Sequence, residues 1–243
     1  MVILTLFFGA VSLFLCTMFI KNNAKRNFWS TISAVVFTGS SVLMIFNYSH
    51  HFGMKQVTTE KTIEIYSASN SDMPLALYQP VGTSGQDDVY IYNRVQHQVK
   101  PNHTQADEYT TSKIKWTNKS TTPHMVVKET RWRYKNNFFS TLYMWSGMDG
   151  RLVKRVNTLE YPTTYVKIST TQANALKKLT SSPQAQQNQQ ATRQQMQSAV
   201  AAQVQAEIAK NPNMTAQQIK DVTTRAQQKI EGQAVKQMLK QLK

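Results

Sequence analysis

The 243-residue chain has little cysteine and few acidic residues, and both shortages limit what the protein can be. Its one cysteine, Cys16, excludes an internal disulfide and any cysteine-rich zinc module. Asp and Glu total 13 against 28 Lys and Arg, which leaves a net charge of +15. Such a charge favours an anionic neighbour: nucleic acid, lipid headgroups or an acidic wall polymer. The length fits one or two domains.

Catalytic and nucleotide-binding motifs are also missing from the sequence. It contains no HExxH, CxxC, GxSxG, GxGxxG or phosphate-binding P-loop pattern. We therefore expect neither an enzyme nor a bound cofactor or metal. If the protein were an enzyme acting on wall or lipid substrates, the candidate catalytic residues would be His97, His103 and Asp87. A metal site would have to combine His97 and His103 with Asp107 and Glu108.

Long uncharged runs are present, and they lie at the N-terminus. Residues 1–20 carry no charge, and at ~1.5 Å per residue they are long enough to cross a ~30 Å hydrocarbon core. Residues 28–48 are likewise uncharged and long enough to span. Since only a short segment separates the two runs, we predict a transmembrane helical hairpin within residues 1–50.

The basic residues between the two runs predict an orientation. Lys21, Lys25 and Arg26 form a short basic loop, which the positive-inside rule places in the cytoplasm, near anionic headgroups. The protein is then a two-pass protein of the cell membrane with both termini extracytoplasmic. The alternative for the first run is a cleaved signal peptide. It is disfavoured because no basic region precedes the run and no small-residue cleavage site follows it.

From residue 51 to 170 the sequence changes to the alternation typical of β-strands. Six segments are rich in aromatic and β-branched residues: 57–69, 88–95, 112–118, 124–135, 151–162 and 163–169. Turn residues such as Asp149-Gly150 separate them. They predict an extracytoplasmic antiparallel β domain, either a small sheet or a sandwich. The predicted fold class is therefore a membrane-anchored α+β protein.

One aromatic stretch, residues 136–148, interrupts the alternation. Its large apolar side chains include Phe138, Phe139, Leu142, Tyr143 and Trp145. Arg131, Arg133 and Lys135 lie just before it, where headgroup phosphates would be if the stretch dipped into a bilayer interface. Two interpretations stay open. The aromatic side chains belong to the core, or they dock on a membrane or protein partner beside the three basic residues.

The C-terminal tail, residues 171–243, is rich in Gln, Ala, Lys and Thr, and it has ten basic and three acidic residues. A flexible linker is predicted at 181–190, followed by a helix over 191–210 that Asn211-Pro212 ends. Thr215 and Gln218 form a capping box that opens a second helix. Both helices carry narrow apolar stripes. They can pair with each other, pack on the β domain or bind another chain.

Two runs carry a resemblance to a known family: LALYQPVGTSGQDDVYIYNR (75–94) and RWRYKNNFFSTLYMWSGMDGRLVKRVNTLEYP (131–162). They resemble a family of two-pass membrane proteins of lactic-acid bacteria that is grouped as a domain of unknown function. The resemblance covers about residues 1–170. It implies an N-terminal helical hairpin, an external domain and a Gln- and Lys-rich end, but it supplies no catalytic residues.

These observations favour a non-enzymatic membrane protein that presents a basic β domain at the outer surface. The expected partners are the lipid bilayer, anionic lipid or wall polymer, and a larger integral membrane protein. Nucleic acid is not expected, because the basic domain faces the exterior and no recognition motif is evident. The alternative is an accessory subunit of a membrane transporter or a quinol-oxidase-like complex. Two spans before an external β domain are also the layout of the second subunit of haem-copper oxidases.

Overall fold

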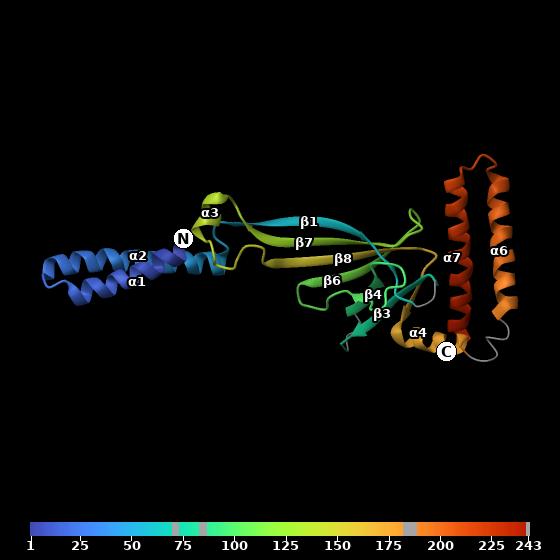
Figure 1. Ribbon diagram of the computed structural model, residues 1–243, viewed down its shortest axis with the longest axis horizontal. Coiled ribbons are helices and arrows are strands. Elements are labelled where there is room, and N and C mark those ends of the chain that lie inside the picture. The colour runs from blue at the N-terminus through green and yellow to red at the C-terminus, as the bar shows by residue number, and fades with distance from the viewer. Residues whose placement is uncertain (70–72, 83–86, 182–188, 242–243) are drawn as a thin grey trace. The chain divides into compact units, whose positions relative to one another are not determined.

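The computed structural model describes residues 1–69, 73–82, 87–181 and 189–241 (Figure 1). The chain divides into two compact units. The first unit comprises residues 1–59 and 129–155, and the second comprises residues 60–128 and 156–243.

Two long apolar helices open the first unit. They are α1 (Val2–Phe19) and α2 (Asn23–His50). The first agrees with the predicted span, whereas the second begins earlier than the predicted residue 28. It does so because the side chain of Asn22 accepts hydrogen bonds from two backbone N–H groups of the first turn and caps the helix. Lys25 and Arg26 therefore lie on α2, and of the predicted loop cations only Lys21 precedes the helix.

The two helices pack closely through small and hydroxyl side chains. A Cβ atom on Gly9 would lie 3.2 Å from the Cα of Phe37, so the backbones approach each other there. Two hydroxyl pairs bridge the helices, Thr5–Ser40 at 3.0 Å and Ser12–Ser33 at 2.8 Å. Away from this seam the helices expose their apolar side chains, and only 11% of the most apolar window of each is buried.

The β-strands form two sheets. The four-stranded sheet has the order β1-β7-β8-β6, with β1 (Met54–Glu64), β6 (Thr110–Thr117), β7 (His124–Tyr134) and β8 (Leu152–Pro162). The other sheet has the order β2-β4-β3-β9, with β2 (Tyr66–Ser67), β3 (Leu75–Val81), β4 (Asp87–Asn93) and β9 (Val166–Ser169). A short strand, β5 (Asn102–His103), pairs with β4.

The strand pairing corrects the prediction of a wholly antiparallel domain. β3 pairs antiparallel with β4 but parallel with β9, so this sheet is mixed. A parallel pair needs a long connection, and here most of the other sheet lies between the two strands in sequence. The predicted strand 57–69 is also two strands. It breaks at the buried Ile65, whose N–H donates to the carbonyl of Pro123 as the chain changes sheet.

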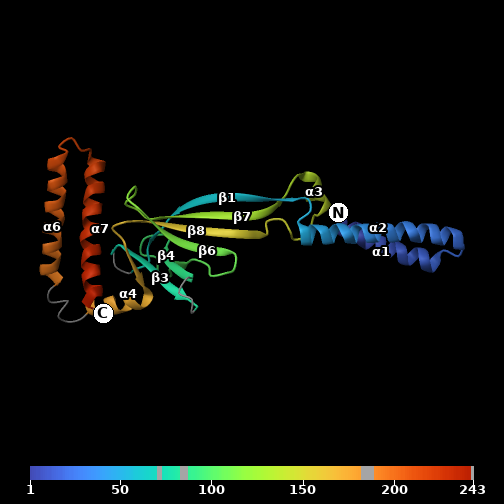
Figure 2. The same ribbon diagram turned by 180° about the vertical axis from the view of Figure 1, so that it is seen from behind.

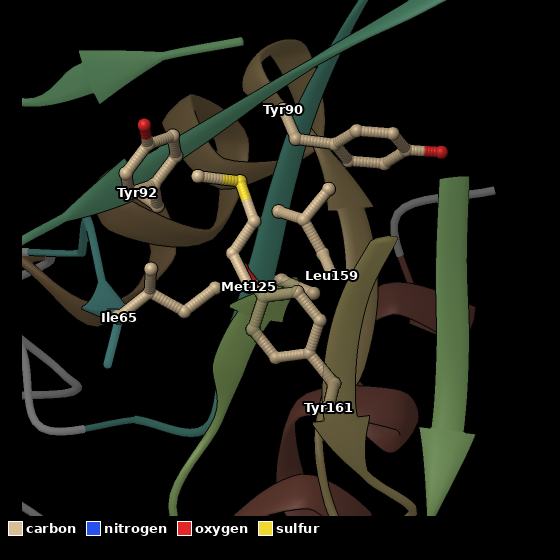
Figure 3. Packing of buried hydrophobic residues seen from close by; sticks show 7 residues of the cluster. Ile65, Tyr90, Tyr92, Met125, Leu159 and Tyr161 are labelled. Carbon is tan, nitrogen blue, oxygen red and sulfur yellow. The ribbon is translucent and has the colours of Figure 1, made fainter. Parts of the chain in front are cut away.

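The main core of the second unit lies between the two sheets (Figure 3). It is made of seven buried side chains: Ile65, Ala76, Tyr90, Tyr92, Met125, Leu159 and Tyr161. Because they come from β3 and β4 of one sheet and from β7 and β8 of the other, the sheets pack face to face as a small sandwich. Aromatic and branched side chains fill this core without any disulfide.

An unpredicted helix, α4 (Thr170–Thr180), follows β9 directly. Ser169 and Gln172 form its capping box, each side chain bonding the backbone N–H of the other residue. Its Leu176 is buried against Leu77 and Ile168 in a second apolar cluster. The start of the predicted tail therefore covers a face of the mixed sheet.

The last two helices run side by side in both views (Figures 1 and 2). They are α6 (Gln189–Lys210) and α7 (Ala216–Gln241). The predicted capping box of Thr215 and Gln218 is confirmed, because each residue's backbone N–H donates to the side chain of the other. α7 also buries Val235 in the cluster that contains Leu176, so it contacts both α6 and the β domain. Residues 182–188 of the predicted linker lie outside the described residues.

The docking of α7 gives a first prediction. A Cβ atom on Gly232 would lie 2.5 Å from the backbone carbonyl oxygen of Thr164, which cannot turn away as a side chain can. Gly232→Val should therefore lower the free energy of unfolding by about 1–3 kcal/mol, although it removes a poor helix former. Urea unfolding followed by far-UV circular dichroism measures this loss.

The matched control is Gln233→Val, on the exposed side of the same helical turn. It should change the stability by less than about 0.5 kcal/mol. Equal effects of the two variants would mean that α7 does not pack on Thr164.

Candidate functional site

The aromatic stretch singled out from the sequence lies beside one end of the helical hairpin, within the first unit (Figure 1). It forms the short helix α3 (Asn137–Leu142), which the side chain of Asn136 caps by accepting a hydrogen bond from the N–H of Phe139. The amino group of Met1 donates to the carbonyl oxygens of Thr141 and Leu142, both at 2.8 Å. The last turn of α3 is therefore tied to the start of α1.

Tyr143 anchors the stretch to α2. Its side chain is fully buried, and its ring stacks on the rings of Tyr134 and Phe139 with centroid distances of 6.0 and 6.4 Å. Burial raises the pKa of Tyr143, so the phenol stays protonated as a donor. Its hydroxyl donates to the carbonyl oxygen of Leu43 on α2 at 3.3 Å.

Phe139 packs on the turn that follows α2. Gly53 in this turn has φ +78°, and a Cβ atom there would overlap the Phe139 ring. The neighbouring Phe52 meets the same ring edge-on at 5.6 Å. One residue earlier, His51 also has positive φ, and its ring stacks on Trp132 of β7 at 4.0 Å. Phe139 and Tyr143 therefore belong to the packed interior of the site.

Phe138 and Trp145 behave differently, because they expose 66% and 67% of their surface. Trp145 also has φ +71°, in a region that bulky residues rarely adopt, at a cost of roughly 1–3 kcal/mol. The side chain of Leu142 is partly buried. Of the five predicted docking residues, Phe138 and Trp145 are thus the ones that present a large apolar side chain outward.

Further exposed rings surround the same end of α2. Phe46, Tyr48 and Phe52 are each about half exposed or more, and they lie on the last turns of α2 and on the turn after it. At the opposite end of α2, Phe28 and Trp29 are exposed and pack edge to face. Aromatic side chains thus mark both ends of the apolar helix. This is the distribution found at the two interfaces of a bilayer.

Six basic residues are predicted to contact anions, and of the three that precede the aromatic stretch, two are held by acidic partners. Arg131 donates to the carboxylate of Glu129 and to the carbonyl oxygen of Gly150, each at 2.8 Å. Arg133 forms an ion pair with Asp149, also at 2.8 Å. An anion would have to compete with these carboxylates for either guanidinium group.

Lys135 is the third, and it is exposed with no ion pair in the part of the chain that the structure describes. The hairpin cations Lys21, Lys25 and Arg26 likewise form no ion pair within the described ranges. These four side chains are therefore open to anionic groups without the loss of an internal partner.

In the described part of the chain, the histidines are not grouped as metal ligands. Among residues 1–69, 73–82, 87–181 and 189–241, no group of three His, Cys, Asp or Glu side chains is placed to hold a metal ion. His97, His103, Asp107 and Glu108 are therefore not brought together in this way, and the side chain of Asp87 lies outside what the structure describes. His124 instead lies 3.0 Å from Glu160, which also binds Lys115 at 2.8 Å.

Comparison with known proteins gives one match. Residues 22–176 match the family described as a domain of unknown function, DUF4811. This range begins just before α2 and ends within α4, so it includes both sheets and α3 but not α6 and α7. It confirms the resemblance to a domain of unknown function. No curated protein and no solved structure matches the chain.

Glu129 makes the stability of the fold depend on pH. The hydrogen bond from Arg131 lowers the pKa of Glu129, and Arg155, which donates at 2.7 Å, adds to this, although partial burial opposes it. A carboxyl group whose pKa is lowered in the folded state stabilises the fold above its unfolded value of 4.5, and this stabilisation is lost as the pH falls through the folded value.

Glu129→Gln should lower the free energy of unfolding by about 1–3 kcal/mol at neutral pH, and the deficit should shrink once the pH falls below 4.5. Urea titrations of the whole chain in detergent at several pH values measure both effects. The control is Glu60→Gln, which removes an exposed ion pair with Lys128 and should cost less than about 1 kcal/mol at any pH. A deficit that is the same at neutral and acidic pH would contradict this role of Glu129.

Proposed function

The chain belongs to the DUF4811 family, and from this premise we propose that it is a non-enzymatic, two-pass protein of the cell membrane. The observation that carries the proposal is the exposure of α1 and α2. Both are long and apolar enough to cross a bilayer, yet only 11% of the most apolar window of each is buried. A core helix of a water-soluble protein would bury this surface, because exposure costs about 25 cal/mol per Å².

The polar residues of the hairpin support the same proposal. The hydroxyl pairs Thr5–Ser40 and Ser12–Ser33 face the seam between the helices. Asn47 is 1% exposed, and its side-chain amide donates to the carbonyl oxygen of Phe52. Polar groups that bond inward and apolar groups that face outward suit a lipid environment, where unbonded polar groups are costly.

The cations at the hairpin tip supply the proposed orientation. Lys21, Lys25 and Arg26 are the only charged side chains in the first 50 residues. The positive-inside rule puts them in the cytoplasm. Both chain ends, the two sheets and the C-terminal helices are then extracytoplasmic.

The surface of Phe138 and Trp145 is proposed to rest in the outer interface of the same bilayer. Their exposure is unfavourable in water, whereas a bilayer interface accepts aromatic rings. Lys135, three residues before Phe138, is then close enough to the headgroups to bind a phosphate.

Outside the membrane, the basic surface is proposed to hold an anionic envelope component. Residues 171–243 alone contain ten basic and three acidic side chains. Attraction between these charges and an anionic polymer acts over about 8 Å at physiological salt, so it operates at close range. Envelope polymers or anionic lipids, and not nucleic acid, are the partners available on that side of the membrane.

The proposed orientation predicts which positions a membrane-impermeant maleimide reaches. In a Cys16→Ser background, Asn213→Cys in the turn before α7 should be labelled on intact cells. Ala24→Cys at the start of α2 should be labelled only after permeabilisation, because it faces the cytoplasm. Labelling of Ala24→Cys on intact cells, or protection of Asn213→Cys, would contradict the proposed topology.

The proposed position of Trp145 in the bilayer interface predicts how strongly nitroxide groups in the lipids quench the tryptophan fluorescence. In vesicles that contain lipids with nitroxide groups near the headgroups, Trp145→Phe should remove a large share of the tryptophan quenching, since the indole lies beside the quencher. Trp116→Phe is the matched control, because Trp116 is also exposed but is not among the residues proposed to enter the interface. Equal quenching with and without Trp145 would show that this side chain does not enter the interface.

A further inference from the structure

A hollow of about 300 Å³ opens at one edge of the second unit. It lies between β6, the segment entering β9, and α7, and it is lined by Trp116, Thr163, Tyr165, Val166, Lys167 and Lys236. β6 and β9 are the terminal strands of their sheets, so each has one side without a neighbouring strand in its sheet. Ligand pockets usually have volumes of about 300–1,000 Å³. The volume of this hollow lies at the lower end of that range, so it accommodates a single ring-sized group.

One wall of the hollow is an exposed flat ring. The side chain of Trp116 is 43% exposed, and the buried Tyr161 lies behind it with a centroid distance of 6.3 Å. Tyr161 is also 5.3 Å from the ring of Tyr165, another lining residue. The face of an aromatic ring is electron-rich, and the C–H groups on the flat side of a sugar ring carry the complementary partial positive charge.

Two further lining residues are lysines, and they differ in what their ammonium groups contact. Lys167 is held at 2.7 Å by the carboxylate of Asp88 and lies 4.3 Å from the centre of the Tyr78 ring. Lys236 is exposed on α7 and forms no ion pair among the described residues. Since Asp88 already pairs with Lys167, Lys236 is the lining cation that an anionic group could meet without displacing a carboxylate among the described residues.

We propose that this hollow binds a sugar ring that carries one phosphate or carboxylate group, as a unit of an anionic envelope glycan. The ring lies on Trp116 and its anionic group meets Lys236. The identification of the partner as an envelope glycan rests on the proposed function, because only an extracytoplasmic unit meets such a polymer. A single unit is expected to bind with a Kd on the order of 1 mM. A chain of repeated units binds more tightly, through effective concentration.

The test uses the whole chain in detergent and follows the indole N–H signal of Trp116 by NMR, assigned with Trp116→Phe. Glucose 6-phosphate and glucuronic acid are titrated as the two sources of charge, with glucose, inorganic phosphate and uridine monophosphate as comparisons. The two charged sugars should shift the signal. Glucose and inorganic phosphate should each bind about tenfold more weakly, because each lacks one of the two contacts.

Variants separate the two contacts. Trp116→Ala should weaken both charged sugars about tenfold, measured by calorimetry. Lys236→Gln should weaken them by a similar factor and leave glucose unchanged. Lys240→Gln is the matched control, one turn along α7 and outside the lining, and it should bind as the parent does. Unfolding curves check the fold of each variant, and Lys236 is exposed, so its replacement tests the site even where Trp116→Ala is unstable.

Four results would overturn the proposal. Tighter binding of uridine monophosphate would assign the hollow to nucleotides, and equal binding of inorganic phosphate would reduce it to a charge effect. Binding that Lys236→Gln leaves intact, or no binding of either sugar, would remove the site. All of these are read in detergent, so they are independent of the maleimide labelling that tests membrane topology.

Discussion

The contact between the Phe139 ring and Gly53 is the constraint on which the first unit depends. Only a residue without a side chain leaves room for this ring at a backbone with φ +78°, so the turn after α2 and the helix α3 fit together at one position. The hydrogen bond from Tyr143 to Leu43 and the stacking of His51 on Trp132 add to the same junction. The end of the apolar hairpin is therefore joined to α3 and β7 by packed rings.

This junction explains why residues 136–148 contain both packed and exposed aromatic side chains. Phe139 and Tyr143 point into the junction, whereas Phe138 and Trp145 remain exposed. Packing of the first pair fixes the backbone, and the fixed backbone holds the second pair outward at the end of α2. A side chain presented on a rigid element loses little further freedom when it enters an interface. The packed residues thus hold the exposed residues in place for the proposed contact with the bilayer interface.

The sequence predicts what local patterns determine. Missing charges mark α1 and α2, and alternation marks most strands. β3 has no such signal, because its first three residues, Leu75–Leu77, are all buried and do not alternate. The capping box of Ser169 and Gln172 is a local signal in the sequence that marks the start of α4. The sequence does not predict the hollow, because Trp116 and Lys236 line it together only through the packing of α7. That packing depends on contacts between residues distant in sequence.

The distribution of ion pairs explains where the net charge of +15 acts. In the sheets and in the turn before β8, acidic residues hold basic ones: Glu60, Asp88, Glu129, Asp149 and Glu160 each bind at least one Lys, Arg or His. The hairpin tip and the tail have few acidic residues, so their cations carry most of the excess. Of the two tail helices, only α7 buries residues, including Val235, among those described. Lys236 follows Val235 directly, so the packing of Val235 holds the backbone of this cation beside the hollow, where the proposed ligand would meet it.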